Sequence, residues 1–583
     1  MRRWLKYVKP YLKSFILGPA GMIVEVIGEM FMPLLLAAII NSGEAGDLTV
    51  GKSIAISAML TAIVLMMMAG GVAGAYFGSK ASVNFAADLR KDVFAKVQKF
   101  SFANIDRFST SSLVTRMTND VTQLQNFVNM LLRMALRSPG MLIGGVIMAV
   151  SLKPSLSVVL AVVIPLMLVV IGMLIKVSFP RFEIMQKKID KLNSTVRENV
   201  TNVRVVKSFV REEYEHQKFS EDNENLKNAG MRAVKVMIYM GPVMNLFMYG
   251  AVIAIIWFGH GIVISEHAMV GGMQVGDLSA FITYATQILS SLMMVTFLLM
   301  NTSRAMASGK RICEVLDEKM DIVDTETADT DKKIVSGDIE FKNVSYRYYK
   351  NSEEAVLKNI NLSIRAGSTV GIIGSTGCGK TTLISMIPRL YDVDSGEVLI
   401  DGANVKDYTL QNLRDGIGIV LQKNLLFSGS IAENLRWGDQ EASDEALRIA
   451  CAHSAADKFV TAFSDGYDTL LEKGGMNLSG GQKQRLCIAR ALIKKPKILI
   501  LDDSTSAVDT ATEAQIRTAL ASDLPECTKI IIAQRISSVK DADEIIVMND
   551  GEITGIGSHE YLLANNPEYG EIYYSQMEKK EAQ

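Results

Sequence analysis

The chain has 583 residues, of which 49% are hydrophobic and 21% are charged, and its formal net charge is −1. The near-zero net charge excludes binding to nucleic acid through overall charge, so we expect no nucleic-acid partner. The high hydrophobic fraction is typical of a membrane protein and argues against a purely soluble multidomain chain.

Residues 1–305 predict an all-α transmembrane domain with six membrane-spanning helices, each of which needs about 20 residues to cross a bilayer. The predicted spans are Ser14–Ile40, Ile54–Phe77, Ser138–Leu152, Leu156–Val177, Ile238–Ile264 and Asp277–Asn301. Two charged connections, near 78–137 and 178–237, keep helical spacing, so we expect the helices to continue into the cytosol. Their bases and the basic N-terminus predict a multi-pass protein in the lipid of the cytoplasmic membrane, with both termini in the cytosol.

The first predicted span carries two acids on one helix face. Glu25 and Glu29 are four residues apart, just before Pro33. Ionisable residues are costly inside a membrane and usually face a protein interior or a water-filled cavity. One interpretation is a wall of a substrate cavity that binds cationic amphiphiles. The other is an acid pair that neighbouring helices satisfy, and the sequence leaves both open.

The second half of the chain has a different pattern. Residues 306–336 predict a polar, acidic linker, residues 337–572 an α/β P-loop domain that remains cytosolic, and residues 573–583 a C-terminal tail. The predicted strands are Ile339–Tyr348, Ser368–Gly374, Glu397–Gly402, Ile498–Asp503 and Lys529–Arg535. All five cysteines follow the last apolar segment without metal-ligand spacing, which predicts reduced structural thiols.

A phosphate-binding loop follows one of these strands. Its residues are Gly374, Ser375, Thr376, Gly377, Cys378, Gly379, Lys380 and Thr381, with Thr382 next in the chain. The glycines let backbone N–H groups turn inward at the start of a helix, Lys380 can reach the β- and γ-phosphates, and Thr381 can coordinate Mg²⁺. Asp502, at the end of an apolar strand, is the expected second metal ligand. We therefore expect ATP and Mg²⁺ as cofactors.

A second motif directly precedes a predicted helix. Leu478, Ser479, Gly480, Gly481 and Gln482 spell LSGGQ. With this motif the chain resembles the exporter branch of the ATP-binding-cassette transporters over nearly its whole length. The resemblance implies that two cassettes stack head to tail, so that LSGGQ and Asp509 contact the partner chain's ATP. It also implies adenine stacking on Tyr348, contact of Gln422 with Mg²⁺, and a cytoplasmic coupling turn near residues 205–213.

Two positions depart from the family pattern. Asp503 stands where the family has a Glu that orients the attacking water, and Gln534 stands where it has a switch histidine. Misplacing a catalytic group by about 1 Å can cost on the order of 10²-fold, and an amide cannot carry the imidazole's proton. Because LSGGQ is intact, we predict a heterodimer in which this chain's own ATP site is impaired and its LSGGQ completes the partner's site.

The resemblance implies ATP-driven export of an amphipathic compound, whether drug-like, lipid or peptide, by this chain and a second half-transporter. Two alternatives stay open. One is an importer built on the exporter fold, and the other is a regulatory or channel-like membrane protein that ATP binding gates.

Overall fold

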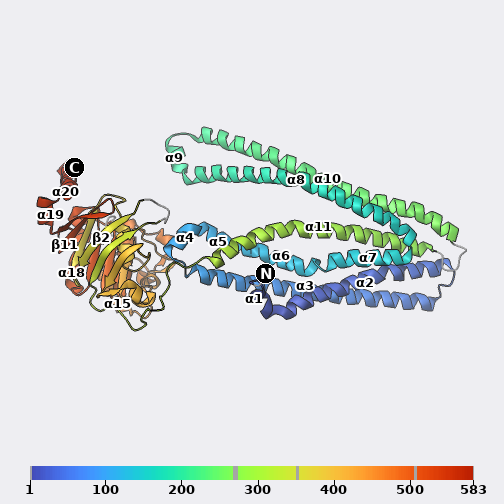
Figure 1. Cartoon of the computed structure of the whole chain (residues 1–583), viewed down its shortest axis with the longest axis horizontal. Coiled ribbons are helices and arrows are strands. Elements are labelled where there is room, and N and C mark those ends of the chain that lie inside the picture. Colours follow the sequence, from blue (N-terminus) through green and yellow to red (C-terminus); the bar gives the residue numbers. More distant parts are fainter. Residues whose placement is uncertain (1–2, 267–272, 349–353, 504–507, 582–583) are drawn as a thin grey trace. The chain divides into compact units, whose positions relative to one another are not determined.

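The computed structural model describes residues 3–266, 273–348, 354–503 and 508–581 (Figure 1). The chain forms two compact units. The first contains Met1–Val97 and Ser111–Asp317, and the second contains Gln98–Thr110 and Glu318–Gln583. A short segment of the helical half of the sequence, Gln98–Thr110, therefore belongs structurally to the second unit.

The first unit is all helical, as predicted. Its helices are α1 (Leu5–Val8), α2 (Leu12–Glu44), α3 (Val50–Val97), α5 (Thr110–Thr115), α6 (Val121–Met134), α7 (Arg137–Leu152), α8 (Pro154–Thr201), α9 (Val203–Ser208), α10 (Glu212–Glu266) and α11 (Val275–Asp317). Within the described residues, six helical stretches are long and apolar enough to cross a membrane. They contain the six predicted spans, and the helices extend well past them, as the periodicity of the connections indicated.

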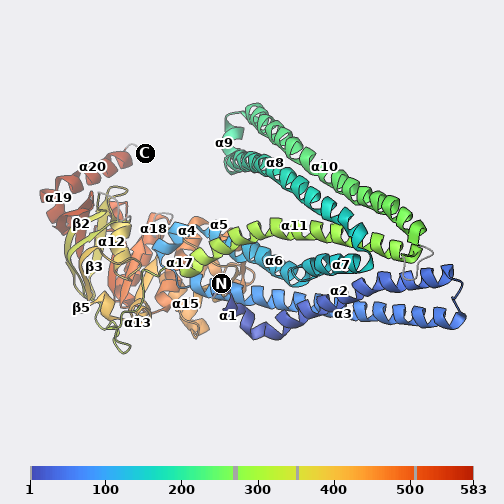
Figure 2. The ribbon, with the colours of Figure 1, turned by 45° about the vertical axis from the view of Figure 1, so that its right-hand side comes forward.

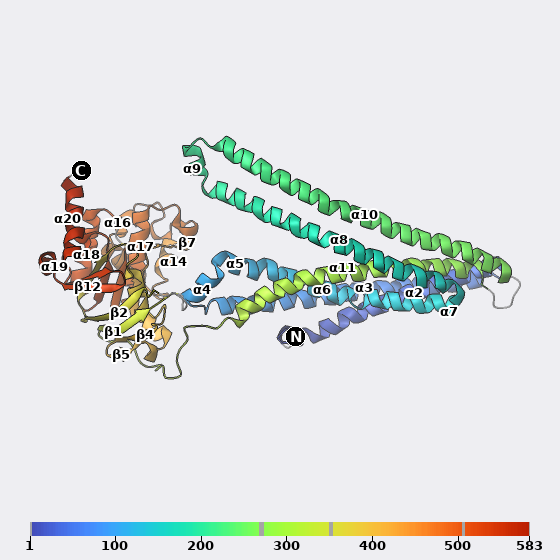
Figure 3. The ribbon, with the colours of Figure 1, turned by 45° about the horizontal axis from the view of Figure 1, so that its top comes forward.

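Small residues let α2 and α3 approach closely. A Cβ atom on Gly21 would lie 2.6 Å from the carbonyl oxygen of Gly70, so no larger side chain fits there without a shift of the backbone. Close contact through glycines is a common way for helices to associate in lipid, where burial of apolar surface gives little driving force. α8 and α10 form a second close pair, joined by α9, and lie side by side in Figures 2 and 3.

Helix α11 corrects the predicted start of the linker at residue 306. It continues to Asp317 because Ile312 and Val315 are buried, which extends its apolar face beyond the membrane span. Its last turns are also fixed by charge, since the Arg311 Nε donates to Asp120 Oδ2 at 2.7 Å. The non-helical connection therefore begins at Glu318, about twelve residues later than predicted.

The second unit contains the predicted α/β domain. A six-stranded sheet has the order β12-β11-β3-β10-β9-β6, and it is parallel except for β12. A four-stranded antiparallel sheet has the order β2-β1-β4-β5. The strands are β1 (Ile339–Tyr346), β2 (Leu357–Ile364), β3 (Thr369–Gly374), β4 (Ser395–Ile400), β5 (Ala403–Asn404), β6 (Ile417–Val420), β9 (Ile498–Asp502), β10 (Thr528–Ile532), β11 (Glu544–Asn549) and β12 (Glu552–Gly557), with β7 (Gly429–Ser430) and β8 (Leu470–Leu471) as a separate pair.

The helices of this unit are α4 (Phe102–Phe108), α12 (Lys380–Met386), α13 (Leu410–Asp415), α14 (Ile431–Leu435), α15 (Asp444–His453), α16 (Asp457–Val460), α17 (Gly480–Ile493), α18 (Thr510–Asp523), α19 (His559–Asn565) and α20 (Pro567–Glu581). All five predicted strands are present, at β1, β3, β4, β9 and β10. The predicted C-terminal tail from residue 573 is instead a continuation of α20, which begins at Pro567 because Tyr569 is fully buried and holds the helix against the domain.

Candidate nucleotide-binding site

The phosphate loop connects β3 to α12, as predicted. Gly379 has a φ of +101°, and a Cβ there would lie 2.9 Å from the carbonyl oxygen of Val356. Gly374 is more constrained, because a Cβ would lie 2.1 Å from the carbonyl oxygen of Met548. A side chain at either position would force the loop open. The glycines therefore let the backbone fold tightly at the start of α12, where N–H groups can bind an anion.

Lys380 and Thr381 lie at the first turn of α12. The Lys380 Nζ donates to the carbonyl oxygens of Gly374 and Ser375, at 2.9 and 2.7 Å, so its ammonium group lies inside the loop. The Thr381 hydroxyl donates to Asp502 Oδ2 at 3.0 Å. The structure thus brings Lys380, Thr381 and Asp502 together at the site that the sequence predicted. Thr381 and Asp502 are 121 residues apart in the chain.

The donor set at this point fits Mg²⁺. Thr381 supplies a hydroxyl and Asp502 a carboxylate, and hard oxygen ligands of this kind are the ones that Mg²⁺ prefers beside a triphosphate. Asp502 is only 2% exposed, and burial raises the pKa of its carboxyl above the ordinary value, although the bond from Thr381 offsets part of that shift. A buried carboxylate with a raised pKa gains when a cation binds to it, which is what a metal ligand requires.

The carboxylate of Asp503 is hydrogen-bonded by Gln534. The Gln534 Nε2 donates to Asp503 Oδ2 at 2.8 Å. Burial raises the pKa of Asp503, and the side chains of Gln422 and Gln534 counteract that effect. The predicted positions 503 and 534 therefore form one hydrogen-bonded pair, next to Asp502 in the chain. Gln484 of α17 adds a bond from Nε2 to the Asp503 carbonyl oxygen at 3.3 Å.

Tyr348 lies in an aromatic cluster next to the phosphate loop. Its hydroxyl is 2.9 Å from the Thr382 hydroxyl, which joins two residues predicted separately to contact ATP. The Tyr348 ring is edge-on to Tyr391, with 5.4 Å between centroids, and Tyr346 packs against both. Tyr348 is 43% exposed, whereas Tyr346 is buried, so Tyr348 is the tyrosine of the pair that can offer a face to an adenine.

The LSGGQ residues form the N-terminus of α17. The Ser479 hydroxyl oxygen accepts from the Gln482 backbone N–H at 3.3 Å, and the Gln482 side chain accepts from the Ser479 N–H at 2.8 Å. This capping box leaves the hydroxyl proton of Ser479 available to an anion at the positive end of the helix. Leu478 is buried and anchors the motif, while Gly480 is exposed and Gly481 is half-buried. Asp509 caps α18 with its side chain, accepting from the Thr512 N–H at 2.9 Å.

Glu25 and Glu29 lie in the other unit, where both are paired with Arg137 of α7. Arg137 Nη1 is 2.9 Å from Glu25 Oε1, and Arg137 Nη2 is 2.6 Å from Glu29 Oε1. The three side chains are 17%, 18% and 26% exposed, so the group is largely enclosed by protein. This geometry favours the second interpretation of the acid pair, in which a neighbouring helix satisfies it. The predicted role as a wall of a substrate cavity stays a prediction.

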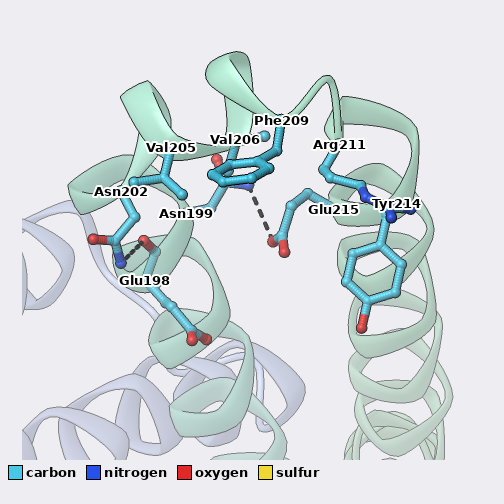
Figure 4. A pocket seen from close by; sticks show the side chains of 9 residues that line it. All are labelled: Glu198, Asn199, Asn202, Val205, Val206, Phe209, Arg211, Tyr214 and Glu215. Carbon is cyan, nitrogen blue, oxygen red and sulfur yellow. Dashed lines mark hydrogen bonds between the residues drawn. The ribbon is translucent and has the colours of Figure 1, made fainter.

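The segment resembling a coupling turn forms α9 and the bend after it. A cleft of about 640 Å³ lies there. Figure 4 shows the side chains that line it, among which Asn199 Nδ2 donates to Glu215 Oε2 at 3.1 Å. Phe209 and Val210 are 72% and 80% exposed at the tip of the α8–α10 pair. These two apolar side chains are therefore open to solvent at the segment that resembles a coupling turn, and its coupling role stays a prediction.

Several residues of these sites had no signal in the sequence. Tyr391 supports Tyr348 from a loop, and Phe102 of α4 packs against it at 6.1 Å between ring centroids. Asn104 of α4 is 2% exposed and donates to the Lys319 carbonyl oxygen at 3.1 Å, and Arg107 pairs with Glu318 at 2.8 Å. A local sequence pattern could not predict these contacts, because the partners of α4 lie more than 200 residues away in the chain.

The chain combines a phosphate loop, a buried strand that ends in a metal-binding acid, and an LSGGQ helix. Together with six apolar helices, these features define an ATP-binding membrane transport protein. Comparisons with known proteins agree. Residues 15–292 match the family described as the ABC transporter transmembrane region, and residues 357–506 match the family described as ABC transporter. The chain belongs to the ABC transporter family, whose ATPase domain couples ATP hydrolysis to transport.

Two relatives and one solved structure illustrate the similarity. YfiB of Bacillus subtilis (strain 168), described as an uncharacterized ABC transporter ATP-binding protein, is 38% identical over 99% of each chain. The ATP-dependent lipid A-core flippase of Syntrophus aciditrophicus (strain SB) is 32% identical over 85% of this chain and 80% of that protein. The structure of a bacterial Atm1-family ABC exporter with ATP bound has a TM-score of 0.76 at 24% identity over 98% of each chain, which shows that the fold is that of an exporter.

Proposed function

We propose that this chain is one half of a heterodimeric exporter that uses ATP to move an amphipathic compound out across the cytoplasmic membrane. In this proposal the chain's own ATP site binds nucleotide but turns it over poorly, and its LSGGQ completes a competent site on the partner. The observation that carries the proposal is the hydrogen-bonded pair of Asp503 and Gln534, taken together with the intact capping box at Ser479 elsewhere in the cassette.

The pair of Asp503 and Gln534 supports poor turnover. An acid that positions an attacking water must reach toward the γ-phosphate, and Asp503 is one methylene shorter than the residue usual in the family. Its backbone cannot move forward to compensate, because the Asp503 N–H donates to the Ile532 carbonyl oxygen at 3.0 Å at the end of the sheet. Gln534 holds the carboxylate with a neutral amide that cannot accept the proton a histidine would share.

Binding of ATP does not depend on that group. Lys380, Thr381 and the glycines of the loop contact the phosphates and the metal, and none of them is altered from the motif. The Ser479 hydroxyl and the dipole of α17 supply donors for a phosphate on an opposed cassette. One half of an asymmetric pair needs an ATP site with intact binding residues. It also needs an LSGGQ motif with intact hydrogen-bond donors, and this chain has both.

We place the cassette and both termini in the cytosol, with α4 and the tip of α9 passing nucleotide-driven movement to the membrane helices. The contacts of Asn104 and Arg107 with residues 318–321 support a role of α4 in that coupling. For the cargo, the flippase among the relatives supports a lipid-like or other amphipathic molecule. Drug-like compounds and peptides share that chemistry.

Two matched substitutions in the assembled transporter test the proposal. The complex is purified from its own membranes through a tag on this chain and placed in lipid nanodiscs, and mass spectrometry identifies the copurifying chain. We expect a different ABC half-transporter with Glu and His at the positions of Asp503 and Gln534. Asp503→Asn should change ATP turnover less than about threefold, while Ser479→Ala should lower it at least tenfold, within the range that loss of one donor to a transition-state oxyanion can cost.

The opposite pattern overturns the proposal. If Asp503→Asn abolishes turnover, this chain's own site is the working one. If the tagged chain copurifies only with itself and hydrolyses ATP at a typical transporter rate, the heterodimer is wrong as well. Asp465→Asn, at an exposed loop position of the same domain, serves as the control for handling and reconstitution.

A further inference from the structure

The C-terminal helix α20 contacts the loop that carries Gln534. Gln576 Nε2 donates to the Gln534 carbonyl oxygen at 2.8 Å, and Gln576 Oε1 accepts from the Ile536 N–H at 2.9 Å. One amide side chain therefore brackets Arg535, with its donor on one peptide and its acceptor on the next. Both directions of this bidentate contact require an amide, because only Asn and Gln offer a donor and an acceptor side by side.

The bracketed peptides lie where the chain leaves the sheet. Upstream, the Ala533 N–H donates to the Ile372 carbonyl oxygen at 3.2 Å, and downstream Arg517 Nη1 donates to the Ser537 carbonyl oxygen at 2.7 Å. Ile536 is 3% exposed. Among the described contacts, Gln576 is the partner that satisfies the Gln534 carbonyl and the Ile536 N–H, so it decides the backbone direction at residue 534.

Helix α20 is firmly held at its other end. Tyr569 is fully buried, and its N–H donates to Asn566 Oδ1 at 2.9 Å. Glu568 accepts from the Thr554 hydroxyl and from Asn549 Nδ2, at 2.6 and 2.8 Å, which ties the helix to β11 and β12. Gln576 follows Tyr569 by seven residues, or about 10 Å along a helix. Gln576, which holds the loop, therefore lies on a helix that is itself fixed to the domain.

We propose that Gln576 is a positioning residue of the nucleotide switch. It fixes the backbone on both sides of Arg535, so that the Gln534 amide points at Asp503, and it acts through that loop without touching ATP. The same contact makes α20 sensitive to the nucleotide, because any movement of Gln534 toward the γ-phosphate must stretch the two hydrogen bonds to Gln576. The inference concerns how the loop is held, so it stands whether or not this chain's own site turns ATP over.

Hydrogen–deuterium exchange of the assembled full-length transporter, with and without Mg–ATP, tests this role. In Gln576→Leu, amides in the peptide covering residues 533–538 should exchange at least tenfold faster, and Mg–ATP should no longer protect that peptide. ATP affinity, measured with a fluorescent ATP analogue, should stay within twofold because the phosphate loop is untouched. Gln576→Glu keeps an acceptor for the Ile536 N–H but lacks the donor, so it should restore part of the protection.

Glu571→Gln is the matched control, since it places the same amide at an exposed position of the same helix and should leave exchange unchanged. A purely structural role of Gln576 would lower the thermal unfolding midpoint and ATP affinity together, and that result overturns the proposal. Unchanged exchange at residues 533–538 in Gln576→Leu overturns it too, as does a Gln576→Glu variant no better protected than Gln576→Leu.

Discussion

Lengthening Asp503 to Glu should raise the turnover of this chain's own ATP site. The extra methylene adds about 1.5 Å of reach. A misplacement of about 1 Å at a reacting centre costs on the order of 10²-fold, equivalent to about 2.7 kcal/mol. The backbone cannot supply that reach, because Asp503 is fixed by its bond to Ile532 and has a φ of +49°. The longer side chain should therefore raise kcat at this site.

The same φ predicts an accompanying loss of stability. Left-handed backbone costs about 1–2 kcal/mol for an ordinary residue, and Asp tolerates it better than Glu does. Asp503→Glu should thus lower the unfolding midpoint of the cassette while it speeds the reaction. That strain is present in both the ground state and the transition state, so it does not offset the expected fall of about 2.7 kcal/mol in the activation barrier. The rate should therefore rise even in the less stable protein.

The assay uses the assembled transporter with Ser479→Ala as the background, because that change should lower turnover at the partner's site at least tenfold, so that turnover from this chain's own site can be measured above it. Adding Asp503→Glu should raise the remaining kcat 10- to 100-fold, with the KM for ATP within about threefold. Adding Gln534→His as well should raise it further. Asp465→Glu controls for a longer acid elsewhere. If kcat in the Asp503→Glu variant does not exceed that of the background, the length of the acid does not limit this site.

Two further predictions concern buried charges. Burial raises the pKa of Asp502 in the folded protein above the ordinary value of 3.8. The contribution of Asp502 to the free energy of unfolding is therefore complete below pH 3.8 and is lost as pH rises through the raised pKa. Asp502→Asn should thus raise the unfolding midpoint of the nucleotide-free cassette at pH 7, but it should remove the further rise that Mg–ATP gives the wild type. Arg137→Met should destabilise the membrane unit by about 3–5 kcal/mol, since it leaves two carboxylates without their cation. The triple variant with Glu25→Gln and Glu29→Gln should recover most of that loss in a detergent unfolding assay, and its transport of cationic dyes should be unchanged if the triad is structural.

Much of the nucleotide site could be predicted from the sequence because its parts are local. A strand, a loop and a helix within about fifteen residues fix the backbone around Lys380, and the capping box at Ser479 needs four residues. Such motifs carry their own geometry. Asp502 was also predictable, since an apolar run ending in an acid indicates a central strand whose end faces the ligand.

The residues that the sequence did not reveal act across long separations. Arg137 pairs with acids 108 and 112 residues earlier, and Gln576 clamps a loop 40 residues before it. Each is an ordinary polar residue on a helix, and only the packing of that helix gives it a partner. The end of α11 was misplaced for a similar reason, because the burial of Ile312 and Val315 continues the helix where the local composition is already polar.

The two faces of this cassette carry different kinds of change, and the difference is informative. A general decline of function would alter binding residues and signature alike. Here Lys380, Thr381 and Asp502 keep their contacts, and Ser479 keeps its cap, while both departures fall on the single bonded pair of Asp503 and Gln534. In the proposed heterodimer, Asp503 and Gln534 would act only on this chain's own nucleotide, and Ser479 only on the partner's. That proposal accounts for the division, because a site that is needed for closure must still bind ATP even when the other site carries out hydrolysis.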